Sequence, residues 1–349
     1  MALRLRRAAR ALAREATLVE RWSAARVHTA TVQPPIAAAV PPPVAAAEAF
    51  MGAWSDDDGT GRGMRMPHIR NPDSLPVLTS LEDVFKTHEA MLETTHSARL
   101  GGHGGYKLGW KANPFIAADS MRLPAMYAPI FAGCFFPSGA EVSLSHHKVF
   151  CAEAEYGFVM GQTLMPRDEP YNEEEVWRAV ASYEPCIELC GARFTTAVAK
   201  ASPYHLLADA MSNALVIRGR AVTTTPSSSL PEALLTNNAV RLFVDGKEAS
   251  SGTGSENPGD SPLGSLTFLV NDLTYRRRKP LEAGHLVIAG HACQVAFSSR
   301  PAPPSARTLP QAQVCGARVV PQAAVEFGAH TVLEGYFEGC GTVRATLIE

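Results

Sequence analysis

The chain has 349 residues, of which 46% are hydrophobic and 19% charged, so it can bury a large core in one or two domains. Its formal net charge is −2 and it has no long basic run, which argues against a nucleic-acid-binding surface. No apolar run approaches the roughly 18 residues of a membrane span, so the sequence predicts no transmembrane helix.

The first 31 residues are rich in arginine and alanine, with no acidic residue before Glu15. This composition predicts a mitochondrial transit peptide over residues 1–31, and hence a matrix location; a basic disordered tail is the alternative. Residues 32–72 are rich in Pro, Ala and Gly and are predicted to form a linker, with the folded catalytic domain at 73–349.

Within that domain, periodicity and turn residues predict a series of helices and strands, interrupted by a Pro/Ser-rich surface insert at 299–324. A helix follows Thr79 and Glu82, which form a potential capping box, and its apolar stripe includes His88 as a core residue. The further expected elements are a short strand after the glycines of 101–105, a strand over 149–160, a helix from 172 to about 182, a strand around 188, a strand ending at 219, a hairpin turning at 245–246, a helix over 261–276 and two closing strands in 325–348. Many strands with few helices indicate an α+β fold built on a mixed sheet or roll.

The seven cysteines are odd in number and scattered through apolar sequence, which favours buried, reduced thiols in a non-oxidising compartment. Cys186 and Cys190 have the spacing of zinc ligands but lack a second pair. We therefore interpret both as packing residues rather than as a zinc site.

Two glutamates, Glu153 and Glu155, occupy one side of the otherwise apolar strand 149–160, with no lysine or arginine in the strand to pair with them. Side chains at i and i+2 of a strand point the same way, so the two carboxylates can converge on a hard divalent cation. Glu188 is a third isolated acid in an apolar strand and could complete the ligand set. The alternative is that the pair faces solvent. Similarly, Lys107 in GYKLGWK is either a cation that meets a substrate carboxylate or an ordinary surface lysine.

The ordered segments GYKLG, AEAEYGFVMGQTL, CIELCGAR, LLADAMSNALVIRG and LEAGHLVIAG resemble the 2-keto-4-pentenoate hydratase family. These hydratases and 2-oxo-acid decarboxylases lie within the fumarylacetoacetate hydrolase superfamily, and the resemblance runs from about residue 80 to 345. It implies that superfamily's mixed β-sheet roll with peripheral helices. It also implies Mg²⁺ or Mn²⁺ bound by Glu153, Glu155 and Glu188, with Lys107 as the catalytic lysine.

The same resemblance implies substrate-binding roles for Asp209, Ser212 and Arg193, which match family positions in ADAMS and ELCGAR. The chain departs from the family at several polar positions, which include the following three. Ile130 and Gly191 replace aspartates, and Ala210 replaces an asparagine. Metal ligands are thus kept while polar groups around the substrate are lost.

The sequence therefore favours a metal-dependent lyase that hydrates or decarboxylates a small 2-oxo acid through a metal-stabilised enolate, in a homo-oligomer. Hydrolysis of a C–C bond in an acylpyruvate is a second hypothesis. It is less favoured because His146 and His147 are poorly placed for the His–Glu pair of such enzymes. A non-catalytic structural or assembly subunit that retains the fold is a third.

Overall fold

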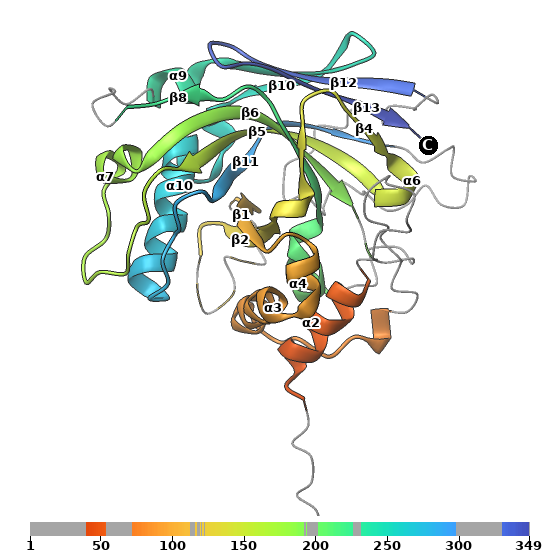
Figure 1. Ribbon diagram of the computed structural model, residues 1–349, viewed down its shortest axis with the longest axis vertical. Helices are drawn as coiled ribbons and strands as arrows, with labels where there is room; N and C mark the ends of the chain where they lie inside the picture. The colour runs from red at the N-terminus through yellow and green to blue at the C-terminus, as the bar shows by residue number, and fades with distance from the viewer. Residues whose placement is uncertain are drawn as a thin grey trace, which may run out of the picture. The chain divides into compact units, whose positions relative to one another are not determined.

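Figure 1 shows the computed structural model of the chain. It describes residues 40–53, 72–111, 116, 119, 121, 123–191, 193, 202–225, 232–297 and 330–348. The transit peptide expected at 1–31 and the insert expected at 299–324 lie outside these ranges and stay predictions. In the described part of the chain, no helix is long and apolar enough to cross a membrane.

Thirteen strands form two sheets in the described residues. The larger sheet runs in the order β2-β1-β11-β5-β6-β7-β3, with β8 paired to β6. Its strands are β1 His103–Gly109, β2 Met126–Phe131, β3 Phe135–Pro137, β5 Val149–Met160, β6 Val180–Gly191, β7 Asn213–Arg218, β8 Val222–Thr223 and β11 Leu286–Ala296. The smaller sheet runs in the order β10-β9-β12-β13-β4. Its strands are β4 Ala140–Ser143, β9 Ala239–Val244, β10 Lys247–Thr253, β12 His330–Phe337 and β13 Gly341–Ile348.

The smaller sheet packs on one face of the long central strands β5 and β6 (Figure 1). The ring of Tyr156 on β5 meets that of Phe337 on β12 edge-on, with centroids 5.1 Å apart, and Ile187 on β6 packs at Gly335. Because strand residues alternate, the next residues along β5, Glu153 and Glu155, point to the opposite face. The two-residue periodicity of the sequence therefore places an apolar core on one side of β5 and carboxylates on the other.

The helices are short and lie around the larger sheet (Figure 1). They are α2 Pro42–Gly52, α3 Leu81–Glu93, α4 Thr95–Arg99, α6 Leu144–His147, α7 Glu173–Arg178, α8 Pro203–Ala208, α9 Glu232–Asn237 and α10 Pro262–Asn271, the last continued by a π-helical turn at Asp272–Arg276. The helix expected from 172 is α7, and a capping box of Asn172 and Glu175 opens it. That helix ends at Arg178, before the expected 182, because Val180 already begins strand β6.

Two sequence predictions in the helical region were wrong. The linker expected over 32–72 contains α2, whose Ala46, Ala47 and Phe50 are fully buried against the core. Alanine is the best helix former and proline suits the first helical turn, so the Pro/Ala composition here specifies a helix. The cap of α3 is Ser80 rather than Thr79, because Thr79 donates two hydrogen bonds to the Asp83 carboxylate instead.

Candidate metal centre

Lys107 and Glu188 meet across the concave face of the larger sheet. Lys107 Nζ donates to Glu188 Oε1 at 2.5 Å, although strand β1 is separated from β6 by β11 and β5. In a flat sheet three strand spacings would hold the two backbones about 14 Å apart, too far for this contact. The curl of the sheet therefore closes the site. Lys107 is 3% exposed, so it is not a surface lysine.

The three glutamates lie together on this face, and all are buried. Glu153 on β5 is the direct cross-strand partner of Glu188 on β6, and Glu155 lies two residues along β5. Directly opposed residues of an antiparallel pair share one face with Cβ atoms about 5 Å apart. The alternative that Glu153 and Glu155 face solvent is thereby excluded.

Glu155 is held by an irregularity in β11. The register between β11 and β5 shifts between Ile288 and His291, and Gly290 adopts a φ of 94° that favours glycine. The shift frees the Gly290 N–H, which donates to Glu155 Oε2 at 2.9 Å. The side-chain amide of Asn257 fixes the bulge by donating to the Gly290 carbonyl oxygen.

A tight turn after α8 supplies the second acceptor for Lys107. Ala210, Met211 and Ser212 all have left-handed backbones, with φ of 46°, 51° and 64°, a conformation that is costly for residues with a Cβ. As a result the Met211 carbonyl oxygen accepts from Lys107 Nζ at 3.1 Å.

Arg193 and Asp209 form a buried ion pair that holds this turn. Arg193 Nη1 donates to Asp209 Oδ1 at 2.6 Å, while its Nη2 donates to the carbonyl oxygen of Asn213 at 2.8 Å. The guanidinium thus ties both ends of the turn together. Burial raises the pKa of Asp209 to about 6, against the opposing effect of Arg193. The arrangement supports a positioning role for Arg193 and Asp209, and their predicted contact with substrate, like that of Ser212, stays a prediction.

The charges at the centre are strongly coupled. Burial opposes ionisation of Lys107, but attraction to Glu188 and the other anionic neighbours outweighs burial and raises the pKa of Lys107 well above its usual value. Burial, together with repulsion from Glu188 and Glu153, raises the pKa of Glu155 well above its usual value. When all three carboxylates are ionised, they exceed the single ammonium by two negative charges, which a divalent cation would neutralise.

The donor atoms also fit a cation. Oε1 of Glu153, Oε1 of Glu155 and Oε2 of Glu188 are buried and make no hydrogen bond with the described part of the chain. One oxygen of Glu153, one of Glu188 and the Cys190 sulfur lie within 4.8 Å of one another. The group of potential ligand atoms therefore differs from the predicted set of three glutamates. It contains Cys190 with Glu153 and Glu188, but not Glu155.

Sequence reasoning missed Asn213 and set Cys190 aside. Asn213 is fully buried at the start of β7, and its Nδ2 donates to Glu188 Oε1 at 2.8 Å. Its only sequence signal is a polar residue directly before the apolar run ALVI. Cys190 carried a usable signal, because it lies two residues from Glu188 and so on the same face of the strand.

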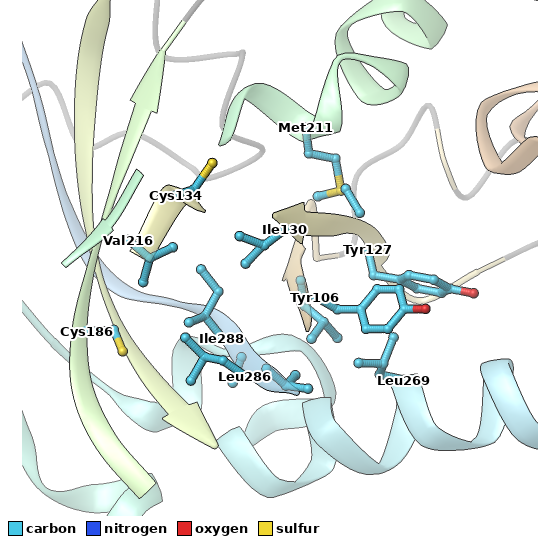
Figure 2. Packing of buried hydrophobic residues seen from close by; sticks show 14 of the residues in the cluster. Tyr106, Tyr127, Ile130, Cys134, Cys186, Met211, Val216, Leu269, Leu286 and Ile288 are labelled. Atoms are coloured by element: carbon cyan, nitrogen blue, oxygen red, sulfur yellow. The ribbon is translucent and has the colours of Figure 1, made fainter. Parts of the chain in front are cut away.

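The departures from the family pattern have physical explanations at two positions. A Cβ at Gly191 would lie 2.4 Å from the His147 carbonyl oxygen, so an aspartate does not fit this backbone. Ile130 is fully buried in the apolar cluster that includes Tyr106, Met211 and Ile288 (Figure 2). At Ile130, apolar core packing stands where the family pattern has a polar side chain.

No protein-family model and no curated protein matches this chain. Among solved structures, it is similar to 4-oxalocrotonate decarboxylase from Pseudomonas putida G7, complexed with magnesium and adipate. The TM-score is 0.64 at 20% identity, covering 88% of this chain and 97% of that chain. The same decarboxylase complexed with calcium and acetate gives a TM-score of 0.60 at 19% identity, with the same coverage. The chain therefore has the mixed α+β fold of that decarboxylase, which confirms the fold class predicted from the sequence.

Proposed function

We propose that this protein is a divalent-metal-dependent enzyme of the fumarylacetoacetate hydrolase superfamily, and specifically a lyase that hydrates or decarboxylates a small 2-oxo acid. The observation that carries the proposal is the buried set of Glu153, Glu155 and Glu188, each with an oxygen that lacks a hydrogen-bond partner among the described residues. Such a set is costly without a cation. The fold similarity adds support, because the decarboxylase structures contain magnesium or calcium together with a carboxylate ligand.

The ion that we propose is Mg²⁺ or Mn²⁺, held by oxygens of the three glutamates. When bound, it would supply Lewis-acid stabilisation of negative charge that develops on the 2-oxo oxygen. The protein's own contribution is orientation and exclusion of water. All three glutamates and Lys107 are at most 4% exposed, so the reacting groups would be held away from bulk solvent.

Lys107 is proposed to orient the substrate carboxylate. An ammonium group has three N–H donors, and the described residues accept two of them, at Glu188 Oε1 and the Met211 carbonyl oxygen. The third N–H is available to the carboxylate of a substrate bound next to the three glutamates. Asn213 and the Arg193–Asp209 pair keep these donors in place, since they fix Glu188 and the turn that carries Met211.

The acylpyruvate hydrolysis alternative gains nothing from the geometry. His146 and His147 lie in α6 with ring centroids 5.0 Å apart, and no described carboxylate forms an ion pair with either. His147 is buried, and burial lowers its pKa to about 4. A neutral histidine without an acidic partner does not form the His–Glu pair that such hydrolysis needs.

Calorimetric titration of Mg²⁺ and Mn²⁺ into the metal-depleted full chain, with and without oxalate, tests the proposal. Oxalate mimics the enolate of a 2-oxo acid. We expect metal-dependent oxalate binding, with metal affinity lowered more than about 100-fold in Glu153→Gln. Glu184→Gln is the matched control, because Glu184, on the neighbouring strand β6, is buried like Glu153 but pairs with Arg218. Binding that ignores Glu153→Gln, or no binding at all, would contradict the proposal and favour a non-catalytic subunit.

A further inference from the structure

Cys190 lies inside the carboxylate cluster rather than beside it. It follows Glu188 by two residues on β6, so both side chains point to the concave face. Its sulfur lies within 4.8 Å of a carboxylate oxygen of Glu188 and of one from Glu153. The residue is 1% exposed, which places the thiol in a water-poor environment.

The carboxylate oxygens next to this sulfur lack partners among the described residues. Glu188 Oε1 already accepts from Lys107 and Asn213, whereas Glu188 Oε2 is buried and accepts no hydrogen bond from any described residue. Glu153 Oε1 is likewise buried, and His291 Nδ1 lies 3.7 Å from it, beyond hydrogen-bonding distance. Two oxygens and one sulfur therefore converge on a point that no described donor fills.

Cys151 on β5 and Cys186 on β6 are two further thiols of this strand pair. Cys186 Sγ lies 3.7 Å from Glu184 Oε1, and Cys151 Sγ lies 3.8 Å from the Ala152 carbonyl oxygen. Neither belongs to the group of potential ligand atoms found in the described residues. The geometry singles out Cys190.

We propose that Cys190 is a further metal ligand beside Glu153 and Glu188, so that the site binds borderline first-row ions such as Zn²⁺, Co²⁺ or Fe²⁺ in addition to Mg²⁺ or Mn²⁺. The inference rests on the proposed function in that it uses the same cation site. Thiolate sulfur binds these softer ions, while Mg²⁺ takes oxygen ligands almost exclusively. His291 lies beside Glu153 and offers an imidazole nitrogen, which these ions also accept. On binding, the S–H bond breaks, a metal–sulfur bond forms and the proton passes to solvent.

The test is a titration of Cd²⁺ and Co²⁺ into the metal-depleted full chain under reducing, oxygen-free conditions, followed by ultraviolet absorption. A thiolate ligand gives a sulfur-to-metal charge-transfer band, which a carboxylate site lacks. We expect this band to saturate at one equivalent. In Cys190→Ser and Cys190→Ala we expect the band to vanish and the affinity for Co²⁺ to fall about tenfold or more, while the affinity for Mg²⁺ changes less than about twofold.

Cys293→Ser is the matched control. Cys293 is a buried thiol on β11 of the same sheet, and its Sγ lies 3.7 Å from the Val240 carbonyl oxygen of the smaller sheet, on the opposite face. It should retain the band. A band that persists in both Cys190 variants would overturn the inference. Ion binding without a band in the wild-type protein would overturn it too but leave the proposed function intact, whereas no ion binding of any kind would overturn both.

Discussion

The two faces of the β5–β6 pair have opposite characters. On one face, Ala154 opposes Ile187 and Tyr156 packs on Phe337, so every contact removes apolar surface from water. On the other, Glu153 opposes Glu188, so the same strand pairing brings like charges together. Like charges directly opposite one another destabilise a sheet.

This contrast separates residues that stabilise the fold from residues that serve a function. Both faces are buried, so burial alone does not distinguish them. The apolar face is explained by folding energetics, whereas the carboxylate face works against them, at a cost that a bound cation would offset. Sites where local chemistry conflicts with stability are where function is expected.

The largest effect expected on stability comes from the apolar face. Ile187→Ala removes a fully buried side chain from between the sheets and should lower the free energy of unfolding by about 3 to 4 kcal/mol. Urea denaturation followed by circular dichroism measures the change. Val332→Ala is the control, because Val332 on β12 is 42% exposed and should change stability by less than about 0.5 kcal/mol. Equal effects would mean that the inter-sheet face is not tightly packed.

His88 tests whether a buried ionisable group outside both faces is neutral. It is 4% exposed on α3, its Nε2 lies 2.9 Å from the Leu207 carbonyl oxygen, and burial lowers its pKa to about 4 from 6.5. Since the folded pKa lies below the unfolded value, its stabilisation is complete above pH 6.5 and is lost as the pH falls through 4. The expected loss is about 3 kcal/mol.

The measurement is urea denaturation at several values between pH 7 and pH 4, comparing wild type with His88→Gln. The glutamine amide can still donate to the Leu207 carbonyl oxygen but does not titrate. The variant should therefore lose less stability toward low pH than the wild type. Identical pH profiles would show that His88 does not cause the loss of stability at low pH. His103 and His147, whose pKa values are also lowered by burial, would then be the groups to test.

Local patterns explain why much of the fold could be predicted. Strand β5 has the predicted bounds, because alternation over twelve residues is a strong signal. The hairpin at Asp245 and Gly246 was also recognisable, and both residues adopt the positive φ that its turn requires. The missed helix α2 was misread because alanine-rich sequence occurs in linkers and in helices alike.

The candidate site was predictable only in part, because local sequence patterns do not show which distant strands and turns come together. The two-residue period places Glu153 and Glu155 on one face, but their closeness to Lys107 depends on the curl across three strand spacings. The Met211 carbonyl oxygen and the Gly290 N–H enter through backbone geometry, at a left-handed turn and a bulge. No side-chain type in the sequence encodes those contacts.

On the carboxylate face, Glu155→Gln should raise the free energy of unfolding, whereas Ile187→Ala lowers it. It removes one of three mutually repelling groups while the glutamine carbonyl can still accept from the Gly290 N–H. We expect the metal-depleted protein to gain about 1 to 2 kcal/mol in free energy of unfolding at pH 7. Urea denaturation with a chelator present measures this. A loss of stability under those conditions would show that the carboxylates do not repel one another as the geometry implies.

The smallest expected effect concerns a buried polar atom on the apolar face, the hydroxyl of Tyr156, whose ring packs on Phe337. Tyr156 Oη is buried and makes no hydrogen bond within the described residues. An unsatisfied buried hydroxyl is unfavourable, so Tyr156→Phe should raise the free energy of unfolding by about 1 kcal/mol while the ring contact with Phe337 is kept. Tyr127→Phe is the matched control and should be destabilising, because its hydroxyl donates to buried Asp272 at 2.7 Å. If both variants lose stability, Tyr156 Oη has a partner, and the two faces are less different than their side chains suggest.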